Sequence, residues 1–176
     1  MIKDSPYFYG LTSKLFHWIL AALIITNLTI GLVMDGIAMP TKLTVIFWHK
    51  SIGATVLIFM VLRLAWRTTQ GFPKMPEAIP AWQQQLARLG HLAFYPLLIL
   101  LPLSGWLLSS AAGYPVSVFG LFTLPDLVSK NKDLRKIFET THDVLGYMIL
   151  VLVIGHVLAA LYHHFVQKTK LIRRML

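Results

Sequence analysis

The chain has 176 residues, of which 56% are hydrophobic and only 13% carry a charge. So small a charged fraction is unusual for a soluble domain and typical of an integral membrane protein. The formal net charge of +9 could indicate nucleic-acid binding, but the lysines and arginines stand between long apolar runs. We interpret them as charges that flank membrane spans, and we expect no nucleic-acid partner.

Four segments are long and apolar enough to cross a bilayer as helices, namely residues 11–34, 46–67, 86–110 and 138–166. The predicted fold is therefore all-α, a single domain over residues 1–176 that forms an integral membrane four-helix bundle. The first segment is longer than the apolar part of a signal peptide, and no small-residue cleavage site follows it. We expect it to be retained as a span.

The orientation in the membrane is predicted from the distribution of lysine and arginine. Ten of these residues fall on the side that holds both chain ends, and six fall on the other side. Because cytoplasmic loops carry an excess of basic residues, both termini are expected in the cytoplasm. Cysteine is absent, which excludes disulfides and thiolate ligation of iron and leaves histidine as the main soft metal ligand.

Histidines lie at two depths of the predicted bundle. His156 follows His142 by fourteen residues, so it returns to within about 40° of the same helix face, roughly 21 Å further along. With spans of alternating direction, His49 shares the outer level with His142, and His17 shares the inner half with His156. Ionisable groups inside a membrane are costly and usually functional, so we treat these four histidines as a candidate site.

Two histidine pairs stacked across a bilayer match the needs of two six-coordinate b-type haems, because neutral imidazole is a good axial ligand. Gly53 and Gly146 each follow a histidine, His49 and His142 respectively, by four residues. A residue without a side chain one turn from an axial histidine leaves room for a porphyrin. Arg63, fourteen residues after His49, is expected at the inner level, where it could pair with a haem propionate.

Three further residues are expected near the two histidine levels or beyond them. Gly31, fourteen residues after His17, should face the outer haem level. His91 begins the third span on the same side as His17, and a propionate contact or a supporting role is favoured over ligation. His163 continues the face of His156 to the membrane interface, where it could contact quinone.

The chain resembles the bacterial cytochrome b561 family over nearly its whole length. The resemblance rests on Phe-His-Trp around His17, on His49 with its glycine and the arginines that follow, and on Leu-Gly-His91-Leu with the later Leu-Pro-Leu-Ser-Gly. It also rests on His142 followed by Gly-Tyr, and on His156 followed by Ala-Ala-Leu-Tyr-His-His.

The resemblance implies a four-helix protein of the bacterial inner membrane with two haems b. His17 and His156 would ligate the inner haem iron, and His49 and His142 the outer one. The family transfers electrons across the membrane, often to or from quinone such as ubiquinone, and at least one branch oxidises superoxide.

We therefore predict electron transfer between an outer-side donor, with superoxide one candidate, and membrane quinone. The expected partners are the lipid bilayer, quinone, a small anionic donor and, in one alternative, a partner redox subunit. In that alternative the chain is the haem-bearing anchor of a larger dehydrogenase or hydrogenase-like complex. A third hypothesis is a proton or metal-ion carrier that uses the histidines as a ladder. Whether the chain is itself an enzyme stays open.

Overall fold

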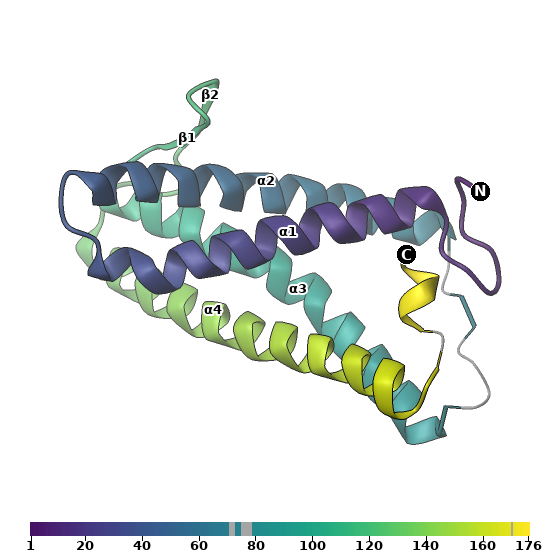
Figure 1. The fold of residues 1–176 in the computed structure, drawn as a ribbon. Coiled ribbons are helices and arrows are strands. Elements are labelled where there is room, and N and C mark those ends of the chain that lie inside the picture. The colour runs from purple at the N-terminus through teal and green to yellow at the C-terminus, as the bar shows by residue number, and fades with distance from the viewer. Residues whose placement is uncertain (71–72, 75–78, 170) are drawn as a thin grey trace.

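Four long helices dominate the computed structural model, which describes residues 1–70, 73–74, 79–169 and 171–176 (Figure 1). They are α1 (Leu11–Val33), α2 (Thr41–Gln70), α3 (Ala81–Ala112) and α4 (Lys132–Leu161). Among the described residues, these four are the helices long and apolar enough to cross a membrane. The predicted all-α four-span fold is confirmed, and both termini lie at the same end of the bundle.

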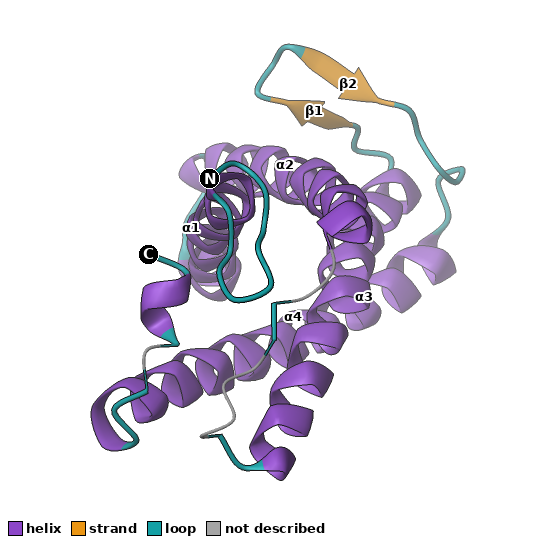
Figure 2. Cartoon of the chain, turned by 90° about the vertical axis from the view of Figure 1, so that its right-hand side faces the viewer, coloured by secondary structure: helices purple, strands orange, loops and turns teal. Residues whose placement is uncertain are grey.

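The helices form a ring in which α1 packs on α2, α2 on α3 and α3 on α4. Figure 2 shows the ring viewed down the bundle axis, from the end that holds the termini. The helices α1 and α4 would close the ring, but they make few direct contacts with each other. We call the end with both termini the terminal end. The opposite end, near which a short β-hairpin projects, is called the hairpin end.

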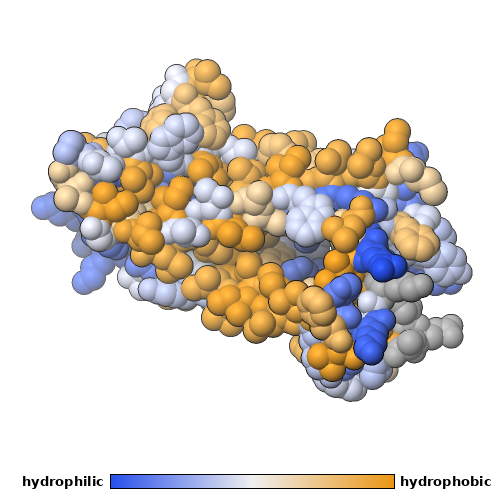
Figure 3. All heavy atoms as spheres, in the orientation of Figure 1, coloured by the Kyte–Doolittle hydropathy of each residue, from blue (hydrophilic) through white to orange (hydrophobic). Residues whose placement is uncertain are grey.

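A small apolar core fills the middle of the bundle. It consists of Leu20, Ile24, Val56, Met60, Leu98 and Ile149, contributed by all four helices. Ile149, which is fully buried, lies on α4 halfway between His142 and His156. The core therefore separates two levels of histidines. Outside it, the helices present an apolar surface, seen as the orange area of Figure 3, that suits contact with lipid.

The helices extend beyond the apolar runs from which they were predicted. The second, third and fourth begin at residues 41, 81 and 132, where hydropathy placed the spans from 46, 86 and 138. The start of α4 has a clear cause, because the Asn131 side chain accepts hydrogen bonds from the backbone N–H groups of Asp133 and Leu134. Local capping continues a helix through polar residues that hydropathy leaves out.

Shorter elements complete the chain at both ends. Strands β1 (Val116–Val118) and β2 (Phe122–Leu124) form an antiparallel hairpin that the sequence did not predict. A π-helical turn, Tyr162–Val166, continues α4, and short 3-10 turns follow α1 at Met34–Gly36 and lie near the C-terminus at Ile172–Arg174.

The two chain ends pack together over the terminal end of the bundle. The Asp4 carboxylate pairs with the Arg67 guanidinium at 2.7 Å, and both side chains are largely buried. The Arg174 guanidinium donates to the backbone carbonyls of Tyr7 and Lys74. These contacts hold the N-terminal segment against α2 and the C-terminal turn.

Candidate haem sites

The pair at the hairpin end is formed by His49 on α2 and His142 on α4. Their ring centroids are 6.1 Å apart, with an angle of 85° between the ring planes. Two imidazoles bonded to one metal at about 2.0–2.1 Å each place their ring centres roughly 6 Å apart. The separation therefore suits two axial ligands of one iron, and the pairing predicted from the spacing of the histidines is present in the structure.

The protonation of His142 follows from its contacts on α3. Its Nδ1 lies 3.0 Å from the Leu101 carbonyl oxygen and 3.0 Å from Ser104 Oγ. The Ser104 hydroxyl itself donates to the same carbonyl at 2.7 Å. Since a carbonyl oxygen has no proton to give, Nδ1 must carry the hydrogen and donate it. The lone pair then resides on Nε2, which is the arrangement that an iron ligand needs.

A glycine allows this close approach. A Cβ atom on Gly105 would lie 2.9 Å from Cε1 of His142, closer than real Cβ contacts, and 3.1 Å from Nδ1, tighter than most of them. The ring therefore rests on the bare backbone of α3, between Gly105 and the two oxygen atoms that accept its proton. Sequence reasoning missed Ser104 and the Leu101 carbonyl as supports. The only signal was the Leu-Pro-Leu-Ser-Gly run, which the resemblance had singled out without a role.

His49 has a different environment. Gly31 on α1 lies against it, with a would-be Cβ 3.4 Å from the His49 Cε1 atom, so the predicted placement of Gly31 at this level is confirmed. The His49 Nδ1 is buried without a well-aligned hydrogen bond, and the Asn27 backbone is the polar group that interacts with the ring. Gly53 faces the Asn27 amide instead of the ring, and nothing lies within 4 Å of a Cβ on Gly146. Gly146 thus borders open space, as the porphyrin prediction requires.

Three histidine rings meet at the terminal end. His17 of α1 lies 6.1 Å from His156 of α4 between ring centroids, the same separation as in the other pair. His91 of α3 lies 5.6 Å from His156, and Phe94 packs edge-on against the same ring. The Arg63 guanidinium interacts electrostatically with both His17 and His156, and its pairing with a haem propionate stays a prediction.

His163 lies beyond this cluster in the π-helical turn that follows α4. Its Nδ1 is buried without a hydrogen-bond partner among the described residues, while its backbone carbonyl accepts from Thr169. A π-helical turn often marks a functional position, because it re-aims side chains that an α-helix would keep on one face.

The two pairs fit a haem better than a bare metal ion. Within the described residues, no three His, Cys, Asp or Glu side chains are grouped so that they could hold a metal directly. A haem supplies four ligands from its own ring and needs two more, which one opposed pair provides. The glycines that lie against both rings, Gly31 beside His49 and Gly105 beside His142, support this fit.

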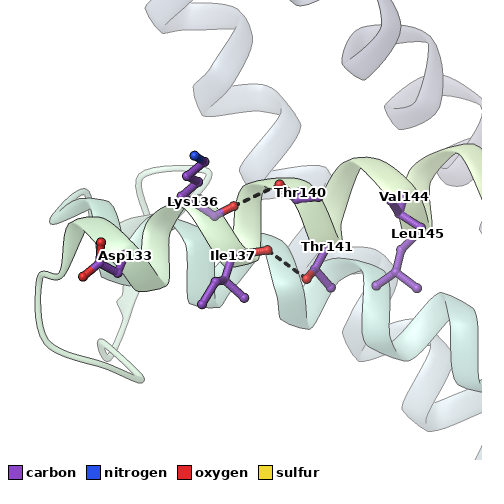
Figure 4. Close-up of a pocket in the computed structure, with 7 residues that line it drawn as sticks. All are labelled: Asp133, Lys136, Ile137, Thr140, Thr141, Val144 and Leu145. Atoms are coloured by element: carbon purple, nitrogen blue, oxygen red, sulfur yellow. Dashed lines mark hydrogen bonds between the residues drawn. The ribbon is translucent and has the colours of Figure 1, made fainter.

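Surface hollows lie elsewhere. The shallow hollow in Figure 4 is lined by one face of the first half of α4, where Thr140 and Thr141 donate to the carbonyls of Lys136 and Ile137. No histidine lines it. The candidate site is therefore the histidine pairs between the helices.

Four membrane-length helices with imidazole pairs at two depths define a class, that of the integral membrane cytochromes b. Comparison with known proteins agrees. The chain belongs to the prokaryotic cytochrome b561 family, whose model matches residues 9–176. It is a haem protein that crosses a bacterial membrane several times and functions in electron transfer.

Three relatives illustrate the similarity. Cytochrome b561 homolog 2 of Escherichia coli (strain K12) is 32% identical over 180 residues, covering 98% of this chain and 93% of the relative. Cytochrome b561 homolog 1 of the same organism is 30% identical over 128 residues, covering 73% of this chain and 72% of the relative. A Yersinia pestis protein named Probable superoxide oxidase CybB is also 30% identical over 128 residues, with the same shares covered.

Proposed function

We propose that this chain moves electrons across the membrane through two bis-histidine b haems, one held at each end of the apolar core. His49 and His142 would ligate the haem at the hairpin end, and His17 and His156 the haem at the terminal end. When bound, the haems supply the one-electron redox chemistry, while the chain supplies ligands, a dry environment and access for donor and acceptor. The observation that carries the proposal is the equal 6.1 Å separation of the two pairs.

His17 is assigned as the second ligand of the terminal-end haem because of how the helices pack. The helices α1 and α4 make few direct contacts, so the space between His17 and His156 is not filled by helix packing. In contrast, α3 and α4 are the most closely packed helices of the bundle, which leaves less room between His91 and His156. We assign His91 and Arg63 to the haem propionates, where a ring N–H and a guanidinium can donate to carboxylates.

The core argues against the proton-carrier alternative. A histidine relay needs a chain of polar groups or water between its members. Here the two levels are separated by a core of fully apolar side chains, including Leu20, Met60 and Ile149, each at most 2% exposed. Electrons can cross such a layer, whereas protons and metal ions are strongly disfavoured in it.

The electron donor is proposed to act at the hairpin end. Superoxide is the specific candidate, because a relative is named as a probable superoxide oxidase. Lys50 follows the ligand His49 and lies 5.9 Å from the centre of the Tyr114 ring, while the Lys130 side chain rests on Gly113. These cations would attract a small anionic donor. We place this end outside the cytoplasm, from the basic residues near the termini.

The acceptor is proposed to be membrane quinone at the terminal end, with ubiquinone as the candidate. A quinone that is reduced takes up protons as well as electrons. The half-buried His163 in the π-helical turn, whose Nδ1 has no hydrogen-bond partner among the described residues, is a suitable donor of a proton or hydrogen bond there.

The test is sided reduction of the purified chain in sealed vesicles, followed by visible spectroscopy. A membrane-impermeant reductant, or a pulse of superoxide, should reduce haem when it is added on the hairpin side, and a quinone in the bilayer should reoxidise it. His49→Ala should remove the hairpin-end haem and block this reduction, while the other haem stays at least in part. His164→Ala is the control, since His164 belongs to neither pair.

Two outcomes would contradict the proposal. If His49→Ala removed only the haem that responds to quinone at the terminal end, the pairing or the topology would be wrong. If the wild-type chain carried haem but passed electrons to quinone only with a second redox subunit present, the anchor-subunit alternative would replace it.

A further inference from the structure

The hairpin β1–β2 is an apolar projection that the electron-transfer proposal does not use. Its strands pair from Val116 with Leu124 to Val118 with Phe122. The turn is tight, with positive φ at both Phe119 and Gly120, and Leu121 N–H donates to the Val118 carbonyl at 3.0 Å. Residues 114–125 contain no charged side chain.

One face of the hairpin is fixed to α2. Val116 and Val118 are buried. The fully buried Ser51 hydroxyl accepts from the Phe119 N–H at 3.0 Å, and its one proton is shared between the Phe47 carbonyl at 2.9 Å and the Ser117 carbonyl at 3.1 Å. The Phe119 ring lies 5.8 Å from the Trp48 ring. These contacts hold the hairpin to α2 at residues 48 and 51, so its depth in the membrane is that of this part of the helix.

The attachment lies well inside the end of α2. Ser51 is ten residues after the start of the helix at Thr41, about 15 Å along its axis. It is also sixteen residues, about 24 Å, before Arg67. Because Arg67 marks the terminal-end boundary and the hydrocarbon layer is about 30 Å thick, Ser51 falls near the opposite edge of that layer. Figure 1 shows the hairpin projecting sideways from the bundle beside α2, towards the end away from the termini.

The tip of this projection has no protein contact that would cover it among the described residues. Leu121 is 81% exposed and Phe122 is 50% exposed. In Figure 3 the end of the hairpin is apolar, like the helix surface beside it. A sideways apolar tip at the edge of the hydrocarbon layer meets the interfacial region of the bilayer, where aromatic and aliphatic side chains are stabilised and water still satisfies free backbone groups.

We infer that the hairpin tip, centred on Leu121 and Phe122, inserts into the lipid leaflet at the hairpin end. The hairpin anchors the segment between α3 and α4 to the membrane surface. The partner is the lipid bilayer itself, and the inference does not depend on the haem assignment.

The absence of cysteine allows a direct test. Leu121→Cys is labelled with a nitroxide in phospholipid vesicles, and its accessibility to oxygen, which concentrates in lipid, is compared with that to a water-soluble nickel chelate. Val151→Cys, at a 70% exposed position in the middle of α4, is the lipid reference. Asp126→Cys, at an exposed charged position just after β2, is the water reference.

We expect the ratio of oxygen to nickel accessibility at residue 121 to exceed that at residue 126 several-fold and to stay below that at residue 151, which lies deeper in the bilayer. A ratio equal to that at residue 126 would overturn the inference, because the tip would then lie in water. Low accessibility to both reagents, with an immobilised label, would also overturn it and would indicate a protein partner or a second copy of the chain.

Discussion

At the residue scale, the hairpin-end site depends on contacts from helices that carry neither of its ligands. His142 belongs to α4, but its proton is received by Leu101 and Ser104 of α3, and its ring rests on Gly105. His49 belongs to α2, and its ring is approached by Gly31 of α1. The helices α1 and α3, which carry no ligand at this level, therefore position the histidine rings of α2 and α4.

Gly105→Ala should displace the His142 ring, because the added Cβ would lie 2.9 Å from Cε1 and the opposing atoms are part of a rigid ring. We expect loss or weakened binding of the hairpin-end haem, measured as a lower haem-to-protein ratio and a changed low-spin spectrum. Gly90→Ala on the same helix is the control, since nothing lies within 4 Å of a Cβ there. Equal haem content in the two variants would contradict the role of Gly105.

Gly146→Leu tests whether the open space beside this residue belongs to a porphyrin. The protein itself offers no atom within 4 Å of a Cβ at this position, so the variant chain should fold. If the space accommodates haem, the leucine side chain should exclude the hairpin-end haem and leave the other one. Full haem content in a folded variant would show that Gly146 faces lipid instead.

Ser104→Ala removes one of the two oxygen atoms that accept the His142 proton. A weaker hydrogen bond makes the imidazole a less basic ligand, which stabilises ferric iron less. We therefore expect a higher midpoint potential for the hairpin-end haem, measured by redox titration, with the other haem unchanged. Ser104→Thr should restore the original value, and Ser110→Ala, a buried serine that contacts no histidine, should have no effect.

The depths of the histidines in the bundle could be predicted from the sequence, but the groups of neighbouring helices that contact their rings could not. Fourteen residues bring a helix back to nearly the same face, so the spacing of His142 and His156 shows their common direction without a structure. The rotation of one helix relative to another is not encoded in the period of either. For that reason the sequence paired Gly53 and Gly146 with histidines of their own helix and placed Gly31 only by its level, whereas the structure places Gly31 and Gly105 against individual histidines of other helices.

At the scale of elements, apolar length predicted the four helices and missed the small elements between and after them. The strands of the hairpin have three residues each and are held through one serine of α2, so no run of alternating residues reveals them. The π-helical turn at Tyr162–Val166 leaves no pattern in hydropathy either.

His163→Ala tests the function of this turn. We expect both haem spectra to stay intact, because His163 belongs to neither pair, and electron transfer between the terminal-end haem and quinone to slow. The measurement is the rate of quinone-linked haem oxidation at several pH values. His164→Ala is the matched control on the neighbouring residue. Unchanged rates in His163→Ala would mean that this histidine only ends the helix at the membrane interface.

At the scale of the whole molecule, the chain is a ring of four apolar helices around a thin dry core, with imidazoles on both sides of it. The fold class followed from composition and hydropathy because a bilayer permits few alternatives to spanning helices. An even number of spans placed both termini at one end, as the structure has them. That this end faces the cytoplasm stays a prediction from the basic residues.

The most direct test of the central claim is the number of haems per chain, measured as pyridine haemochrome against protein concentration in the purified, fully loaded protein. We predict two haems b in the wild-type chain, and one in His142→Ala, whose other pair is intact. One haem in the wild-type chain, or an unchanged count in His142→Ala, would contradict the claim that each histidine pair holds its own haem.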